Sequence, residues 1–164
     1  MKSKKNVYIV ITLLVCFEIT FSLFIFISDS KTPLDYLKTE YDADYRKPTE
    51  LLYQETLNNG IIIVFFINQY GAFDCTLMEE NIIGYNILGY SGSIDINDAD
   101  TYLYGSFKKG QNVIDICWGI LTDNNISEVL LDNQNCVIVD TAYNEFRLFW
   151  LTGIWDNLPT LVKK

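Results

Sequence analysis

Residues 57–67, LNNGIIIVFFI, are the clearest indication of the fold class of this chain. The Asn58–Asn59–Gly60 sequence is typical of a tight turn between two strands. We therefore predict a β-hairpin that pairs residues 51–56 with residues 61–67. Because every residue from 61 to 67 is apolar, the second strand is expected to be buried on both faces and to run through the middle of the core.

Residues 73–78 show the two-residue period of a strand with two unlike faces. Phe73, Cys75 and Leu77 are expected to face the core. The residues between them are expected to form a wetter face, and these are Asp74, Thr76 and Met78.

The chain after residue 80 repeats this pattern of short strands and turns. The clearest strand spans residues 114–120, where Ile114, Ile116, Trp118 and Ile120 share one face. Strands spaced about ten residues apart favour an antiparallel β-sandwich or a barrel-like domain, so the fold class is predicted as mainly β. The predicted strands are 51–56, 61–67, 73–78, 82–90, 102–107, 114–120, 126–131, 136–142 and 146–151, with a last one near Leu161, a turn at 79–81 and a polar loop at 91–101.

The charge balance and the absence of histidine exclude several kinds of function. Asp and Glu number 21 against 12 Lys and Arg, which gives a net charge of -9. Such an acidic chain repels phosphate polymers, so nucleic acid is excluded as a partner. Without histidine, Ser-His-Asp and Cys-His nucleophile systems cannot form, and the commonest zinc sites lack their imidazole ligands. No cofactor is predicted.

The N-terminal part contains a long apolar run, Val7–Ile27, with the sequence VYIVITLLVCFEITFSLFIFI. A helix needs about 20 apolar residues to cross a bilayer, so the run is predicted to be a transmembrane helix in contact with membrane lipid. Lys2, Lys4 and Lys5 precede it, and the positive-inside rule then places the N-terminus in the cytoplasm. The alternative is a cleaved signal peptide.

This interpretation makes the protein a single-pass protein of the cell membrane, with its C-terminal domain outside the cytoplasm. The predicted parts are a cytoplasmic tail at residues 1–6, the transmembrane helix at residues 7–27, a juxtamembrane stalk at residues 28–48 and an extracytoplasmic β domain at residues 49–164.

The stalk contains the signature of one short helix. Thr32 is a typical N-cap residue, and Pro33 is favoured at the first helical position. Leu37 and Tyr41 follow on the same helical face. A short amphipathic helix over residues 33–41 is therefore predicted.

Two interpretations are open for Glu18, and two for the cysteines after the apolar run. Glu18 lies in the middle of the apolar run. It either pairs with a partner helix or is tolerated because the other residues of the run are apolar enough to offset it. Cys75, Cys117 and Cys136 are expected to be buried thiols that pack as small hydrophobic residues. One disulfide between neighbouring strands is the alternative.

Two loop sequences resemble known site motifs but lack part of them. Asp95–Asp100 gathers oxygen ligands as a calcium loop does, but Ala99 stands where a ligand belongs and no glutamate closes the loop. Gly89–Ser93 resembles a nucleophile elbow, but Ser93 replaces its second glycine and no histidine exists to activate Ser91. Neither segment is predicted to be a functional site.

The remaining candidates for a functional site are two adjacent carboxylates and a group of aromatic residues near the C-terminus. Glu79 and Glu80 could serve as acid and base in a glycosidase, but neighbours in a turn usually point apart into solvent. Phe149, Trp150 and Trp155 could form a binding patch, but at strand spacing they are more often part of the core. No catalytic, cofactor-binding or metal-binding residue is therefore predicted.

Residues 117–126, CWGILTDNNI, are followed by a valine-rich strand and a late aromatic strand. This arrangement resembles an uncharacterised family of small extracytoplasmic, membrane-anchored proteins of Bacillus-type bacteria, in which a WGI…D…I segment joins two strands. The resemblance covers about residues 50–155. It implies a β fold and a location outside the cytoplasm, and it implies no site residues, because those proteins have no assigned activity.

The leading hypothesis for function is a non-enzymatic protein-interaction module that contacts a membrane or cell-surface protein. It rests on the apolar anchor, the aromatic-rich β domain and the lack of catalytic residues. The alternative is a carboxylate-dependent hydrolase acting on cell-envelope glycan, which needs two carboxylates about 5–9 Å apart in a cleft.

Overall fold

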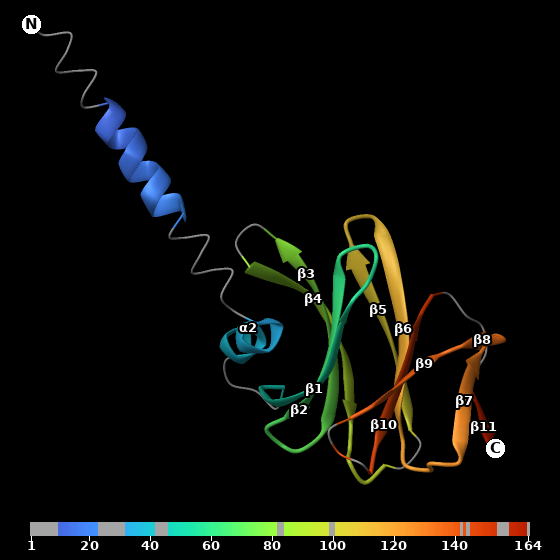
Figure 1. The fold of residues 1–164 in the computed structure, drawn as a ribbon. Coiled ribbons are helices and arrows are strands. Elements are labelled where there is room, and N and C mark those ends of the chain that lie inside the picture. The colour runs from blue at the N-terminus through green and yellow to red at the C-terminus, as the bar shows by residue number, and fades with distance from the viewer. Residues whose placement is uncertain are drawn as a thin grey trace, which may run out of the picture.

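A computed structural model gives the fold of the protein (Figure 1) and describes residues 10–22, 32–41, 46–81, 84–98, 101–141, 143, 145–153 and 158–163. A helix occupies residues 10–22. The other elements are α2 (Pro33–Glu40), β1 (Pro48–Thr56), β2 (Ile61–Asn68), β3 (Phe73–Asn81), β4 (Gly84–Ile94), β5 (Tyr102–Lys109), β6 (Asn112–Leu121), β7 (Ile126–Leu131), β8 (Gln134–Asn135), β9 (Val137–Asp140), β10 (Arg147–Thr152) and β11 (Thr160–Lys163).

The strands form three antiparallel sheets, which confirms the prediction of a mainly β fold. Sheet A has the order β1-β2-β3-β4, sheet B the order β5-β6-β10-β9, and sheet C the order β11-β7-β8. Sheets A and B face each other as a sandwich. Figure 1 shows helix α2 on the outer side of sheet A and sheet C on the opposite side of the sandwich.

The main core fills the space between sheets A and B. Phe65 of β2 and Trp118 of β6 meet at its centre, with their ring centroids 5.5 Å apart. Both side chains are fully buried. Sheets in a sandwich are stabilised by side chains that interdigitate in this way from the two inner faces. The other buried members are Leu52, Ile61, Ile63, Ile67, Phe73, Cys75, Leu77, Ile94, Phe107, Ile116, Ile120, Leu148 and Trp150.

Strand β2 is buried along its whole length because both of its faces are covered. Its odd-numbered residues from Ile61 to Ile67 belong to the core shared with sheet B. Ile62, Val64 and Phe66 form a second apolar cluster with the fully buried Leu37 of α2. The prediction that this strand runs through the middle of the core is therefore confirmed.

The prediction of a wetter face on residues 73–78 is wrong. Phe73, Cys75 and Leu77 face the main core as expected. Asp74, Thr76 and Met78 are also buried, however, because segments from another part of the chain cover the outer face of sheet A. Met78 packs in the cluster under α2, and Tyr41, just after the helix, contacts Thr76 through a 3.2 Å hydrogen bond between the hydroxyls.

Several strand ends differ from the predicted ones. Strand β3 continues through the predicted turn at residues 79–81. Strand β4 continues to Ile94, into the predicted loop, where Phe73 pairs with Ile94. Ile94 is buried, and the hydrophobic gain from that burial extends the ladder beyond the point at which local polarity predicts its end.

The prediction of a transmembrane helix at Val7–Ile27 is wrong for the residues that the structure describes. Within this segment the structure describes residues 10–22, which are helical. None of the described helices is long and apolar enough to span a membrane. This finding contradicts the single-pass topology and the membrane location that followed from it. The rest of the predicted segment and the tail at residues 1–6 lie outside the described residues.

The prediction of a short helix after Thr32 is confirmed. Helix α2 begins with Pro33, and the Thr32 side-chain oxygen accepts a hydrogen bond of 3.2 Å from the backbone N–H of Asp35. This is the bond expected of an N-cap threonine. The helix buries Pro33 and Leu37 against sheet A, which makes it part of the β domain's packing.

Candidate functional site

A buried carboxylate, Asp74, is the centre of a polar cluster on the outer face of sheet A. The Asn68 amide nitrogen donates to one carboxylate oxygen at 3.1 Å. The Tyr90 hydroxyl donates to the other oxygen at 3.0 Å and also contacts the Ser93 hydroxyl. Arg46 stacks over the Tyr90 ring at 4.0 Å from its centroid. A buried carboxylate needs such partners, because an unpaired one is costly to remove from water.

The electrostatics of this cluster favour a structural role for Asp74. Burial raises the pKa of the Asp74 carboxyl above its ordinary value. Hydrogen bonds from Ser93, Asn68 and Tyr90 oppose that shift, and so does the Arg46 charge. Both carboxylate oxygens already accept hydrogen bonds from neighbouring side chains, and the residue is 0% exposed. The cluster therefore joins β3, β4 and the segment before β1, and it does not present the carboxylate to a ligand.

The raised pKa of Asp74 gives a testable pH dependence. A group whose pKa is higher in the folded state contributes stability below its unfolded pKa, and the contribution is lost as pH rises through the folded pKa. We expect the stability of the wild type relative to Asp74→Asn to be greatest below the ordinary pKa of a carboxyl, about 4, and to fall as the pH rises above it. Urea unfolding of both proteins across this range measures the difference.

Asp123→Asn is the matched control, because its effect has the opposite sign. Lys163, 2.8 Å from the carboxylate, and the backbone N–H of Asn125 lower the pKa of Asp123. The stability that Asp123 contributes is present above its ordinary pKa and is lost as pH falls. If both substitutions shift the pH profile in the same direction, the assignment of a raised pKa to Asp74 is incorrect.

Ser91 lies in the core of the sandwich and has a structural role. The indole N–H of Trp118 donates to the Ser91 hydroxyl oxygen at 2.6 Å. The Ser91 hydroxyl in turn donates to the backbone carbonyl of Cys75 at 3.4 Å. These bonds satisfy a polar side chain between two sheets, and they account for the serine in the Gly89–Ser93 segment.

The two adjacent glutamates do not come together. Glu79 lies 3.2 Å from the ammonium group of Lys109 and accepts a 3.1 Å hydrogen bond from Asn86. Glu80 is exposed and follows it in the same strand. Because successive residues of a strand point to opposite faces, the two carboxylates are directed apart. They do not form the acid and base pair of a glycosidase.

The acidic loop after β4 forms a turn among its own residues. One Asp95 carboxylate oxygen accepts hydrogen bonds from the backbone and side-chain nitrogens of Asn97, at 2.9 and 2.8 Å. Ala99 and Asp100 lie outside the described residues. Among the residues that the structure describes, no group of three or more Asp, Glu or Cys residues is placed to hold a metal ion.

Phe149 and Trp150 are buried in strand β10, as the core interpretation predicted, and Trp155 lies outside the described residues.

Of the cysteines, Cys75, Cys117 and Cys136 are buried free thiols. Cys117 lies in β6, and Cys136 directly precedes β9. Strand β10 lies between β6 and β9 in sheet B, and both thiols pack in the same buried apolar cluster, as the buried-thiol interpretation predicted.

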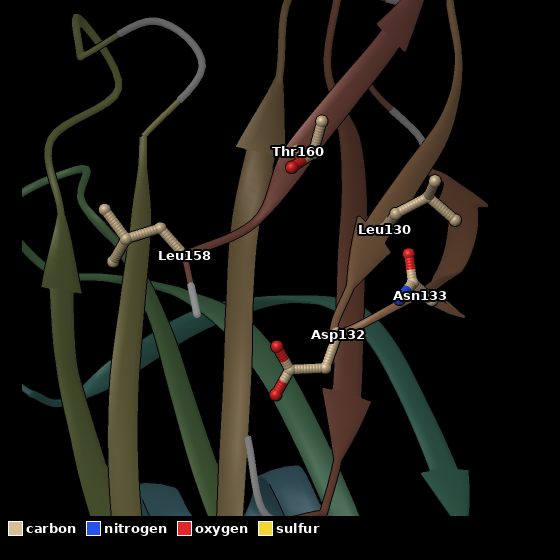
Figure 2. A pocket seen from close by; sticks show the side chains of 5 residues that line it. All are labelled: Leu130, Asp132, Asn133, Leu158 and Thr160. Carbon is tan, nitrogen blue, oxygen red and sulfur yellow. The ribbon is translucent and has the colours of Figure 1, made fainter. Parts of the chain in front are cut away.

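An open pocket of about 430 Å³ on sheet C is the candidate functional site, which we call the sheet-C pocket (Figure 2). It is formed where the β7–β8 turn meets the start of β11. Strand β11 reaches this position by pairing with β7, with Thr160 opposite Leu130. The residues that line the pocket are Leu130, Asp132, Asn133, Leu158 and Thr160.

The β7–β8 turn explains how the polar residues of the pocket are presented. Asp132 and Asn133 have positive φ values of 49° and 61°. Positive φ at both central residues is the conformation of a type I′ hairpin turn, and Asp and Asn adopt it more readily than other residues with side chains. Burial, the Cys117 thiol and Tyr102 raise the pKa of Tyr104 in β5, and the Asp132 charge contributes least to this shift.

Sequence reasoning identified Asp132 and Asn133 only as a turn and missed the pocket. Leu158 and Thr160 are far from them along the chain, and no local pattern shows that β11 pairs with β7. The only usable signal is the expectation of a last strand near Leu161.

Comparison of the chain with models of known protein families, with curated proteins and with solved structures found no match in any of the three. The resemblance carried by residues 117–126 therefore stays a prediction.

Proposed function

We propose that the protein is a non-enzymatic protein-interaction module that holds a side chain of a protein partner in the sheet-C pocket. The observation that carries the proposal is the mixed lining of this pocket, with two leucines beside a carboxylate, an amide and a hydroxyl. Binding sites combine apolar walls with a few polar groups in this manner. At about 430 Å³, the pocket is at the small end of the about 300–1,000 Å³ range of ligand pockets.

The chemistry of the lining supports binding rather than catalysis. Asp132 is the one carboxylate among the five lining residues, whereas glycoside hydrolysis requires two. Thr160 is the one hydroxyl among them, and none of the five is a histidine or an amine, the bases that usually activate such a hydroxyl as a nucleophile. These groups suffice to orient a bound side chain.

Exposed apolar side chains also support an interaction role. Leu158, at the rim of the pocket, is 65% exposed. In the helix at residues 10–22, the large apolar side chains are about half exposed or more, and Phe17 and Phe21 stack with ring centroids 6.0 Å apart. Contiguous exposed apolar surface is uncommon in proteins that act alone, and it marks surfaces that contact another molecule.

A pocket-filling substitution tests the proposal. Thr160→Trp places an aromatic ring in the pocket at an exposed strand position that tolerates large aromatic residues. The tagged full chain and the variant are used to retain proteins from an extract of the source cells, and the retained proteins are quantified by mass spectrometry. We expect at least one protein to be retained at least about tenfold less by the variant, since displacing a bound side chain typically removes more than about 1.4 kcal/mol.

Val113→Trp is the matched control. Val113 is a β-branched residue of β6 that is 60% exposed, and it does not line the pocket. This variant adds the same exposed ring elsewhere on the surface, so it should retain the same proteins as the wild type. Equal retention by all three proteins, or retention of no protein by the wild type, would contradict the proposed function. Equal thermal stability of the two variants shows that both remain folded.

A further inference from the structure

Four connections between strands lie at the same end of the sandwich, and we call this surface the loop end. In sheet A, Phe73 follows the β2–β3 turn and pairs with Ile94, which precedes the β4–β5 loop. In sheet B, Arg147 follows the β9–β10 loop and pairs with Leu121, which precedes the β6–β7 turn. Figure 1 shows the four connections at the lower end of the sandwich. The described residues of the loop end are 69–72, 95–98, 101, 122–125, 141, 143, 145 and 146.

Contacts between the two sheets bring the loops of sheet A next to those of sheet B. Phe73, at the start of β3, packs edge to face against Phe146, just before β10, with ring centroids 5.2 Å apart. The Tyr143 hydroxyl, in the β9–β10 loop, donates a hydrogen bond to the Glu50 carboxylate of β1. Glu50 pairs with the part of β2 that leads directly into the β2–β3 turn. The β9–β10 loop therefore lies beside the β2–β3 turn, and the loop end is a continuous surface.

Tyr70 is the most prominent side chain of the loop end. It is 74% exposed, the largest exposed fraction among the large apolar and aromatic side chains that the structure describes. Its backbone is nevertheless held firmly, because the Asn68 side-chain oxygen accepts hydrogen bonds from the N–H groups of Tyr70 at 2.9 Å and Ala72 at 3.1 Å. Asn68 is itself bonded to the buried Asp74. The turn thus presents an aromatic ring to solvent from a fixed backbone.

The other loops of this surface are held by similar side-chain bonds to the backbone. Asp95 and Asp123 each accept a hydrogen bond from the backbone N–H two residues later, at 2.9 and 2.8 Å. The Thr141 hydroxyl oxygen accepts one from the N–H of Tyr143 at 3.2 Å. Ile96 and Tyr143 are each 37% exposed on these loops. A partner that covers such a surface loses little free energy to the ordering of loops, which favours binding.

The charges of the loop end determine which kind of partner it fits. The exposed carboxylates on its loops and on the strand ends beside them are Glu50, Asp95, Asp98, Asp140 and Glu145. The exposed cations described there are Lys47 and Lys163, and Lys163 is paired with Asp123. Together with the net charge of -9 for the whole chain, this excess of carboxylates attracts cationic partners and repels anionic ones.

We propose that the loop end is a second interaction surface, which binds a basic segment of a protein with the Tyr70 ring as its aromatic anchor. Tyrosine is enriched among the residues that contribute most to protein–protein binding, and arginine side chains stack on its ring. The surface is separate from the sheet-C pocket, because β7 begins at the loop end with Ile126 and the pocket residue Leu130 lies near its other end. The inference therefore goes beyond the proposed function.

Selection from a random dodecapeptide library displayed on phage tests the proposal, with the full chain as the bait. The library is first depleted on the Tyr70→Ala variant and then selected on the wild type. We expect binders to remain after depletion, and we expect them to contain more Lys and Arg, relative to Asp and Glu, than the unselected library. The proposal is wrong if depletion removes every binder or if the selected peptides show no excess of basic residues.

The affinities of the selected peptides, made synthetically, measure the contribution of the aromatic anchor. Tyr70→Ala should weaken binding at least about tenfold, as expected for a residue that anchors an interface. Val113→Ala is the control, because Val113 is 60% exposed and lies near the start of β6, at the opposite end of the sandwich. This variant should bind the peptides as the wild type does. Both side chains are exposed, so equal thermal stability of the three proteins is expected.

Two charge reversals separate the loop end from the overall charge. Asp98→Lys and Glu80→Lys change the net charge equally, but Asp98 lies in the β4–β5 loop and Glu80 near the far end of β3. We expect Asp98→Lys to weaken peptide binding about fivefold and Glu80→Lys to change it little, because exposed charges act mainly over short distances in salt. Equal effects of the two reversals would overturn the proposal.

The remaining results identify other occupants. Peptides whose binding is lost in Thr160→Trp and retained in Tyr70→Ala occupy the sheet-C pocket, which overturns this inference and leaves the proposed function in place. Sedimentation of the wild type as a dimer and of Tyr70→Ala as a monomer would show that a second copy covers the loop end, and the inference of a basic partner would then be wrong.

Discussion

Trp118→Ala is expected to lower the free energy of unfolding by about 3–5 kcal/mol, the usual cost of removing a large aromatic side chain from a core. Trp118 is fully buried, and its ring packs against Phe65 of the opposite sheet. The substitution leaves a cavity between sheets A and B. Domains of this kind have a total stability of only about 5–15 kcal/mol, so the variant should unfold at a much lower urea concentration. Far-UV circular dichroism during urea unfolding measures the change without relying on tryptophan fluorescence.

Trp118→Phe and Ser91→Ala separate packing from hydrogen bonding at the same position. Trp118→Phe keeps a buried ring but loses the N–H that donates to Ser91. Ser91→Ala keeps the indole but leaves its N–H without that acceptor, which should cost about 1–3 kcal/mol. Because the two residues share one bond, the double variant should lose less than the sum of the single losses. Additive losses would show that the bond does not contribute to stability.

Gly119→Ala is expected to cost about 2–4 kcal/mol, although it adds only one methyl group. A Cβ at this position would lie 2.3 Å from the backbone carbonyl oxygen of Thr101 and 2.7 Å from the Phe149 ring. The same Thr101 oxygen accepts a hydrogen bond of 3.0 Å from the N–H of Ile120. The chain must therefore shift at Thr101, and this hydrogen bond is stretched or lost. Urea unfolding measures the loss.

Gly110→Ala is the control for the effect of backbone conformation. Gly110 has a positive φ of 63°, and no atom lies within 4 Å of the position of an added Cβ. Its substitution should cost about 1–2 kcal/mol from the left-handed backbone alone. A loss at Gly119 no greater than that at Gly110 would show that the approach of Thr101 to β6 does not restrict the side chain at position 119.

Local sequence patterns were sufficient to predict the strands in which apolar residues either follow one another without a break or alternate regularly with polar ones. The turn at Asn58–Gly60 and the apolar run of residues 61–67 correctly predicted β1 and β2 as a hairpin, with β2 in the middle. The C-terminal end of β4 could not be predicted, because the pairing of Phe73 with Ile94 extends the ladder through residues that are polar when considered alone. Strand β3 continues to Asn81 because Glu80 and Asn81 pair with Tyr85 and Gly84 at the start of β4.

The candidate site was less predictable than the fold. The sheet-C pocket depends on Leu158 and Thr160 lying next to Asp132, and only the pairing of β11 with β7 brings them together. The residues that did resemble site motifs have structural partners instead. Ser91 bonds to Trp118 in the core, and Glu79 is paired with Lys109.

Three properties follow from the residue types alone: the strand character of residues 61–67, the acidic charge and the exclusion of every chemistry that needs histidine. These properties depend on residue type and on spacing within a few positions. The burial of Asp74 and the position of Asp132 at a pocket follow from the three-dimensional packing of the chain instead. Burial depends on which distant segment packs on a given face. Arg46, before β1, stacks on the Tyr90 ring that bonds to Asp74, and β11 completes the pocket. The two-residue alternation along a strand does not show which face is covered, because the segment that covers it lies elsewhere in the chain.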